Sequence, residues 1–177
     1  MFNEYMNCFY FGAGAFKHYA DDIKSCSTSS RDNEIHEAFG ALIRVYLLAD
    51  KLHDLATANI AIDEIIRFSD IVNIVPRESR VCLAYSHTAE RSPLRLLMRD
   101  FWVYDMNPSG KLPLHNAPAD FLRDIALEFF HAKDKGWKQT VDQALYKHPK
   151  ENTEKDKCHY HQHDEKHPRC GLEPDST

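Results

Sequence analysis

The chain has 177 residues, the length of one domain with room for a tail. Its apolar residues make up 43% of the sequence, which is enough for a buried core and too much for a chain that is disordered throughout. The formal net charge of −5 lacks the basic excess that is typical of nucleic-acid-binding domains, so a simple phosphate-binding role is disfavoured.

The N-terminus and the cysteines favour an intracellular protein of the cytoplasm or nucleus. Glu4 comes early in the aromatic N-terminal segment and no basic region precedes it, so a signal peptide is not expected. The longest apolar runs are far shorter than the roughly 20 residues that cross a bilayer, so no membrane span is expected. The five cysteines are odd in number and mostly scattered, which predicts reduced thiols rather than a disulfide framework.

The first part of the chain joins an aromatic-rich segment to a polar one. Residues 5–16, YMNCFYFGAGAF, fit a buried core or, as the alternative, an exposed binding patch. Gly12 and Gly14 lack the further glycine and the acidic residue of a dinucleotide-binding loop, so they are expected to end a helix. The serines and charges of residues 21–34 predict a loop.

Two consecutive helices form the best-defined pattern in the sequence. The first has apolar residues at offsets 0, 3, 4, 7 and 8 and more on its other sides, so we expect it to be buried nearly all round. These residues are Phe39, Leu42, Ile43, Tyr46 and Leu47, with Val45 and Leu48 beside them. The apolar face of the second is Leu55, Ala58, Ile62, Ile65 and Ile66. The short junction at His53–Asp54 predicts an antiparallel hairpin.

Prolines mark the helices that follow. Pro76 suits the first turn of a helix that runs to about Thr88. Ser92 is expected to cap the next helix, with Pro93 in its first position. The apolar face of that helix is Leu94, Leu97, Met98 and Phe101. Residues 105–118 contain three prolines and a glycine and predict a loop.

Two more helices are expected beyond this loop. Pro118 opens the first, whose predicted apolar face is Leu122, Ile125, Ala126 and Phe129. The second follows Gly136 and carries Trp137, Val141, Ala144 and Leu145. No alternating run of convincing length indicates a strand. The predicted fold class is therefore mainly α, with antiparallel helical hairpins, about six or seven helices in all and a polar Cys/His tail.

No motif of a known catalytic type is present. The sequence has no P-loop and no GxSxG elbow. Cys82 and His87 lie five residues apart, which places them off one helical face, so we expect a core cysteine and a surface histidine rather than a thiol–imidazole pair. No catalytic residue and no cofactor-binding residue are predicted, and the chain is not expected to be an enzyme.

The polar tail, residues 147–177, holds one cluster with metal-binding chemistry. Cys158 and His161 are separated by two residues, and after a further five residues His167 and Cys170 repeat that spacing in reverse order. Two thiolates and two imidazoles make a tetrahedral zinc set, and His163 is a substitute for one of the histidines. The alternatives are a histidine-rich disordered tail and another metal role. A structural zinc site would fold a segment that has little apolar content of its own.

Several segments resemble BTB/POZ domains, especially those of the fungal type. LIRVYLLADKLHDLATANIAIDEII at Leu42–Ile66 resembles their helical half, and FNEYMNCFYFG at Phe2–Gly12 is similar to the helix before it. YSHTAERSPLRLLMRDFWVYD at Tyr85–Asp105 looks like the helical extension after the domain. The family begins with a β-α-β half that carries the main dimer helix, and this chain starts after that half.

The resemblance implies a non-enzymatic protein–protein interaction module. The implied roles are self-association, partner docking, and adaptor or scaffold work for cullin-based ubiquitin ligases. The domains would be a partial BTB/POZ-like helical region at 2–68, a helical extension at 76–146 and the tail. If the β-rich half is absent, Phe2, Tyr5, Phe9 and Tyr10 should be exposed. The alternative function is a zinc-binding factor associated with nucleic acid or chromatin.

Overall fold

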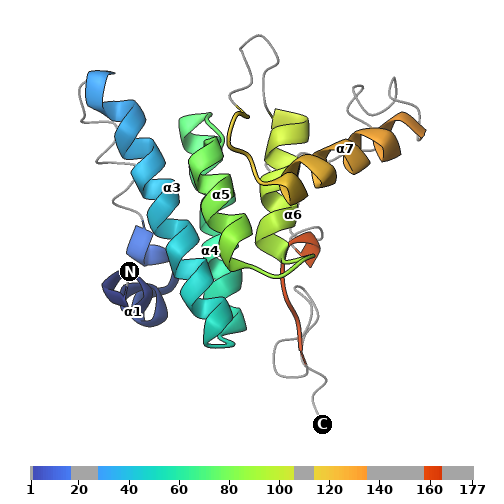
Figure 1. The fold of residues 1–177 in the computed structure, drawn as a ribbon. Helices are drawn as coiled ribbons and strands as arrows, with labels where there is room; N and C mark the ends of the chain where they lie inside the picture. The colour runs from blue at the N-terminus through green and yellow to red at the C-terminus, as the bar shows by residue number, and fades with distance from the viewer. Residues whose placement is uncertain (1, 17–27, 106–113, 135–157, 165–177) are drawn as a thin grey trace. The chain divides into compact units, whose positions relative to one another are not determined.

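A computed structural model describes residues 2–16, 28–105, 114–134 and 158–164 (Figure 1). Within these ranges the chain is mainly helical, with six α-helices, two shorter helical segments and no β-strand. The mainly α fold class is therefore confirmed. No helix in the described ranges has the length and apolar character needed to span a bilayer. The chain divides into two compact units, residues 1–74 with 153–177, and residues 75–152.

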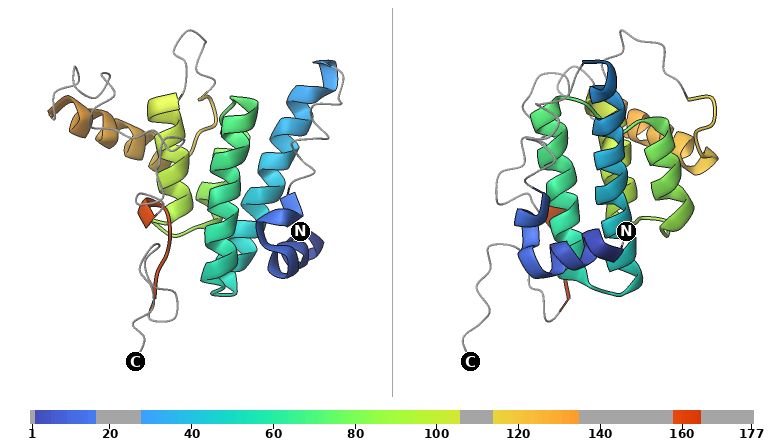
Figure 2. Two further views of the ribbon diagram at one scale, coloured as in Figure 1. Left: turned by 180° about the vertical axis from the view of Figure 1, so that it is seen from behind. Right: turned by 90° about the vertical axis from the view of Figure 1, so that its left-hand side faces the viewer.

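A helical hairpin is the centre of the first unit. Helix α3 spans Thr28–Lys51 and α4 spans Leu55–Val72, and the two lie side by side in Figures 1 and 2. The predicted face of α3 is buried, as are the predicted Ala58, Ile62 and Ile65 of α4. Phe39 and Phe68 meet edge to face across the hairpin, with ring centroids 4.9 Å apart. The predicted antiparallel hairpin is thus confirmed.

Helix α3 is longer at its start than the sequence pattern indicated. Residues 28–34, in the predicted loop, belong to its first two turns, while residues 21–27 lie outside the described residues. The polar residues Arg31, Asp32 and Asn33 are exposed there. A helix can continue into a polar, solvent-facing turn because its backbone bonds do not depend on an apolar face, so hydrophobic periodicity alone missed this end.

Asp54 fixes the junction between α3 and α4. Its Oδ1 accepts a hydrogen bond from the Thr57 backbone N–H at 3.0 Å, which caps the first turn of α4. Its Oδ2 accepts a second one from the Tyr5 hydroxyl at 3.0 Å. His53 has a φ of 56°, a left-handed conformation that makes the reversal tight. One carboxylate therefore joins the hairpin turn to the N-terminal helix.

Helix α1, Phe2–Phe11, packs on this hairpin through Tyr5 and Cys8. Gly12 follows with a φ of 55° and begins the 3-10 segment η1, Gly12–Phe16, whose last residue is buried. A left-handed residue directly after a helix is the usual position for glycine. The prediction that a helix ends at the glycines is confirmed, because α1 ends at Phe11.

The second unit contains α5, Glu78–His87, α6, Pro93–Asp100, and the π-helical turn η2, Phe101–Asp105. The predicted face of α6, from Leu94 to Phe101, is fully buried. Pro93 stands in the first turn, as predicted. Ser92 occupies the N-cap position, but its side chain makes no capping hydrogen bond, so that part of the prediction is wrong.

Helix α7, Ala119–Asp134, buries a different face from the predicted one. Among the residues of α7 whose burial is described, Phe121 is fully buried, and its ring centroid lies 5.2 and 5.6 Å from those of Tyr85 and Trp102. Leu122 is 41% exposed and Ala126 is also exposed. The inward positions Asp124 and Glu128 accept hydrogen bonds, which an apolar pattern does not register. The predicted last helix, from Trp137, lies outside the described residues.

Candidate functional sites

The segment 158–164 lies against α4 in the first unit. Asn59 holds it with a pair of hydrogen bonds, because its Nδ2 donates to the Gln162 carbonyl and its Oδ1 accepts from the Gln162 N–H, each at 2.9 Å. One helical turn further along α4, Asp63 Oδ1 lies 3.0 Å from His161 Nε2. Tyr160, the residue before His161, is buried. This part of the tail is therefore held in a defined position against α4.

Three of the five predicted metal ligands fall in that segment. Cys158 and His161 lie close along the chain, and the His161 N–H donates to the Cys158 carbonyl at 3.4 Å. The rings of His161 and His163 have centroids 6.1 Å apart. Both ring nitrogens of His163 are buried and make no hydrogen bond in the described part of the chain.

The predicted zinc set is not assembled by these residues alone. Among residues 2–16, 28–105, 114–134 and 158–164, no three His, Cys, Asp or Glu side chains form a metal-binding group. His167 and Cys170, the second half of the set, lie outside the described residues. The donor chemistry fits zinc, and the His161–Asp63 pair is the carboxylate contact that orients many zinc-binding histidines. The site stays a prediction.

Helix α1 presents aromatic side chains on its outer face. Phe2, Phe9, Tyr10 and Phe11 are between 57% and 71% exposed. Phe9 stacks edge to face on Tyr10, with centroids 5.5 Å apart, and lies 6.3 Å from Tyr5. The expected exposure is confirmed for Phe2, Phe9 and Tyr10, whereas Tyr5 is buried because its hydroxyl reaches Asp54.

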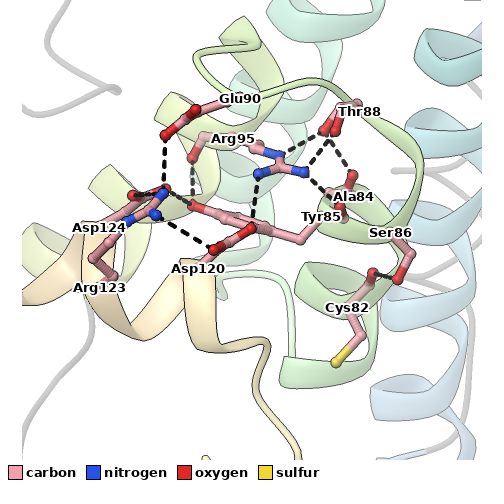
Figure 3. A network of polar contacts seen from close by, with 10 residues as sticks. All are labelled: Cys82, Ala84, Tyr85, Ser86, Thr88, Glu90, Arg95, Asp120, Arg123 and Asp124. Atoms are coloured by element: carbon pink, nitrogen blue, oxygen red, sulfur yellow. Dashed lines mark hydrogen bonds and ion pairs between the residues drawn. The ribbon is translucent and has the colours of Figure 1, made fainter.

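A buried arginine organises the second unit (Figure 3). The Arg95 guanidinium lies 4.6 Å above the Tyr85 ring and donates to the Tyr85 and Thr88 carbonyls at 2.7 and 2.6 Å. Its Nε also donates to the Thr88 hydroxyl at 3.1 Å. These two carbonyls end α5, so a cation on α6 meets the negative pole of the α5 dipole. The network fixes the α5–α6 turn.

Carboxylates of α7 complete this arrangement. The Tyr85 hydroxyl donates to Asp124 Oδ2 at 3.0 Å, and the Tyr104 hydroxyl donates to Glu128 Oε1 at 2.7 Å. Arg99 pairs with Glu128 at 3.3 Å. Burial, with the carboxylate beside each phenol, raises the pKa of Tyr85 and of Tyr104 well above the usual value. Both phenols therefore act as neutral hydrogen-bond donors.

Cys82 and His87 do not form a reactive pair. The Cys82 thiol donates to the Asn116 carbonyl at 3.4 Å, while His87 Nδ1 lies 3.0 Å from the Leu83 carbonyl. Partial burial, and then the nearby Glu78, raises the pKa of the Cys82 thiol. A raised pKa disfavours the nucleophilic thiolate. His87 lies on the surface as expected, whereas Cys82 is only partly buried and not in the core.

Sequence reasoning missed the tail's position against α4 and the Arg95 network. Asn59 and Gln162 are 103 residues apart, and no local pattern links them. A weak signal existed for Arg95, because it directly follows the buried Leu94 in a short helix whose other residues separate clearly into an apolar face and a polar face.

Searches of protein-family profiles, curated proteins and solved structures find no match to this chain.

Proposed function

We propose that this protein is a non-enzymatic protein–protein interaction module of the BTB/POZ type, acting inside the cell as an adaptor or scaffold. The observation that carries the proposal is the exposed aromatic surface of α1, formed by Phe2, Phe9, Tyr10 and Phe11. Aromatic side chains are enriched among the residues that dominate binding energy at protein interfaces. A cluster of them on one short helix is typical of a docking surface.

The position of α1 supports this role. Tyr5 and Cys8 attach the helix to the α3–α4 hairpin, so its outer aromatics are presented on a packed element rather than on a loose end. Preformed surfaces bind better because fewer groups must be ordered on association. The BTB/POZ resemblance names the expected partners, which are a second copy of the chain or a cullin-type scaffold of a ubiquitin ligase.

The test replaces the aromatics of α1 without touching its buried side. Phe9→Ser with Tyr10→Ser should abolish concentration-dependent self-association in sedimentation equilibrium, or the co-purification of a cullin with the full chain. The matched control is Phe130→Ser on α7, because Phe130 is 65% exposed and belongs to the other unit. A wild-type chain that stays monomeric at high concentration and captures no cullin contradicts the proposal, as does equal loss in the control.

We also propose that the tail binds one zinc ion through Cys158, His161, His167 and Cys170, with His163 as a substitute. The buried, unbonded nitrogens of His163 and the Asp63–His161 contact support a metal in this segment. Zinc would hold the tail closed and supply folding energy there. Metal analysis of the purified chain should give one zinc per molecule, lost in Cys158→Ser and Cys170→Ser. A metal-free wild type after refolding with zinc contradicts it.

A further inference from the structure

A cavity of about 370 Å³ in the second unit is lined by the α5–α6 turn, α6 and α7. Its walls combine two leucines, Leu96 and Leu127, with a group of charged side chains. These are the arginines 91, 95, 99 and 123, the carboxylates Glu90, Asp124 and Glu128, and His131. The cavity is large enough for one amino-acid side chain or a small aromatic molecule.

Most of these charges already have partners. Glu90 and Asp124 pair with Arg123 at 3.1 and 3.5 Å, and Glu128 pairs with Arg99 at 3.3 Å. Arg95 is engaged by backbone carbonyls and lies 3.7 Å from Asp120. Asp120 also lies 3.5 Å from Arg123, and Asp100 lies 2.7 Å from Arg99.

Two exposed cationic or ionisable side chains at the cavity have no such partner. Arg91 and His131 make no ion pair or hydrogen bond with any residue that the structure describes. Arginine is well suited to bind carboxylates and phosphates, because its planar group donates two parallel hydrogen bonds. Arg91 and His131 are therefore available to bind an anion at this cavity.

The backbone at Arg91 has an unusual conformation. Arg91 has a φ of 66°, and it is the third residue of a turn that the Ser92 N–H closes onto the Ala89 carbonyl at 3.2 Å. Glycine is favoured at such a position, because a side chain there is strained. Strained residues that persist are often found at functional sites.

We propose that this cavity binds an anionic group carried on an aromatic or aliphatic stem, such as an aryl phosphate. Arg91 and His131 contact the anion, and Leu96 and Leu127 contact the stem. The same chemistry is offered by a free small molecule and by a phosphotyrosine side chain in a peptide. The site lies on the α5–α6 turn, α6 and α7, so it does not depend on the role of α1.

The experiment follows the amide resonances of the full chain by NMR during titration with three probes. These are phenyl phosphate, inorganic phosphate, and a short peptide with a single phosphotyrosine. Phenyl phosphate should bind saturably and at least tenfold more tightly than inorganic phosphate, because only the former fills the apolar walls. Tighter binding of the peptide than of phenyl phosphate assigns the site to a protein partner, and the reverse order assigns it to a small molecule.

Arg91→Gly separates binding from folding. Glycine suits the positive φ, so the melting temperature should stay the same or rise, while the affinity for phenyl phosphate should fall at least tenfold. Arg31→Ala, an exposed arginine on α3 with the same loss of charge, should leave the affinity unchanged. Absence of saturable binding by any probe overturns the proposal, as does wild-type affinity in Arg91→Gly or an equal loss in Arg31→Ala.

Discussion

Two leucine side chains of the second unit differ strongly in how deeply they are buried. Leu97 is fully buried on α6, whereas Leu122 is 41% exposed on α7, although the sequence pattern placed both on apolar faces. Burial of a whole leucine side chain contributes about 2 kcal/mol, and its removal also leaves a cavity. The two leucines should therefore respond very differently to truncation.

Leu97→Ala should lower the free energy of unfolding by about 2–5 kcal/mol. Leu122→Ala should change it by less than about 1 kcal/mol, because the side chain is partly exposed and its truncation leaves no enclosed cavity. Urea denaturation of both variants measures the difference. Similar values for the two positions would show that the buried face of α7 is not the one that Phe121 defines.

The two phenols that donate to carboxylates of α7 predict a loss of stability at alkaline pH. The pKa of Tyr85 and of Tyr104 is raised in the folded chain, so unfolding releases their protons once the pH exceeds the usual tyrosine value of about 10. The stabilising contribution is complete below that pH and decreases as the pH rises toward the folded values. Absorbance at alkaline pH should show that Tyr85 and Tyr104 ionise late, together with Tyr5, whose pKa is also raised by burial and by Asp54.

Substitution of each tyrosine identifies which phenols ionise late. Tyr85→Phe and Tyr104→Phe should each remove one late-titrating group and flatten the alkaline part of the stability profile. Tyr10→Phe is the control, because Tyr10 is 69% exposed. Ionisation of all tyrosines in one step near pH 10 while the chain remains folded is the result that contradicts this prediction.

At the scale of elements, α4 has two functions on different sides. One side packs on α3 through Phe68 and its apolar neighbours, and the other holds the tail through Asn59 and Asp63. Asn59 and Asp63 are four residues apart, so they lie one above the other on the helix. The tail segment has few apolar groups, and its attachment depends on Tyr160 and on these polar contacts.

Asn59→Ala should detach this segment locally. The two hydrogen bonds to Gln162 are lost, each with a net value of about 0.5–1.5 kcal/mol. Hydrogen exchange at the Gln162 amide should become faster by about tenfold or more, while exchange in the middle of α3 stays slow. Asn33→Ala, at an exposed position of α3, should leave both unchanged. Unaltered exchange at Gln162 would mean that Asn59 does not hold the tail.

On the scale of the whole molecule, the division into two units predicts separable unfolding. Both tryptophans belong to residues 75–152, so tryptophan fluorescence reports on the second unit alone. Leu97→Ala should shift the fluorescence transition to lower temperature. Ile65→Ala, at a buried position of α4, should shift part of the helical circular dichroism and leave the fluorescence transition in place. Coincident shifts of both signals in both variants would show one cooperative unit.

The sequence by itself determined the fold class, the α3–α4 hairpin and the buried face of α6. These features follow from local periodicity and from a short junction, which a chain expresses in consecutive residues. The same local signals placed the end of α1 at Phe11–Gly12 and the proline at the start of α6. They failed for α7, because its inward side carries Phe121 with the hydrogen-bonding Asp124 and Glu128 rather than an apolar stripe.

Only the tertiary structure decided which side chains meet over long separations. Asn59 and Gln162, Tyr5 and Asp54, and Tyr85 and Asp124 are each joined by hydrogen bonds between distant parts of the chain. Such pairs produce no periodic pattern in the sequence, because the path of the backbone between the two residues decides whether they come into contact. The same holds for the cavity at Arg91, whose charge balance depends on which carboxylates already have partners.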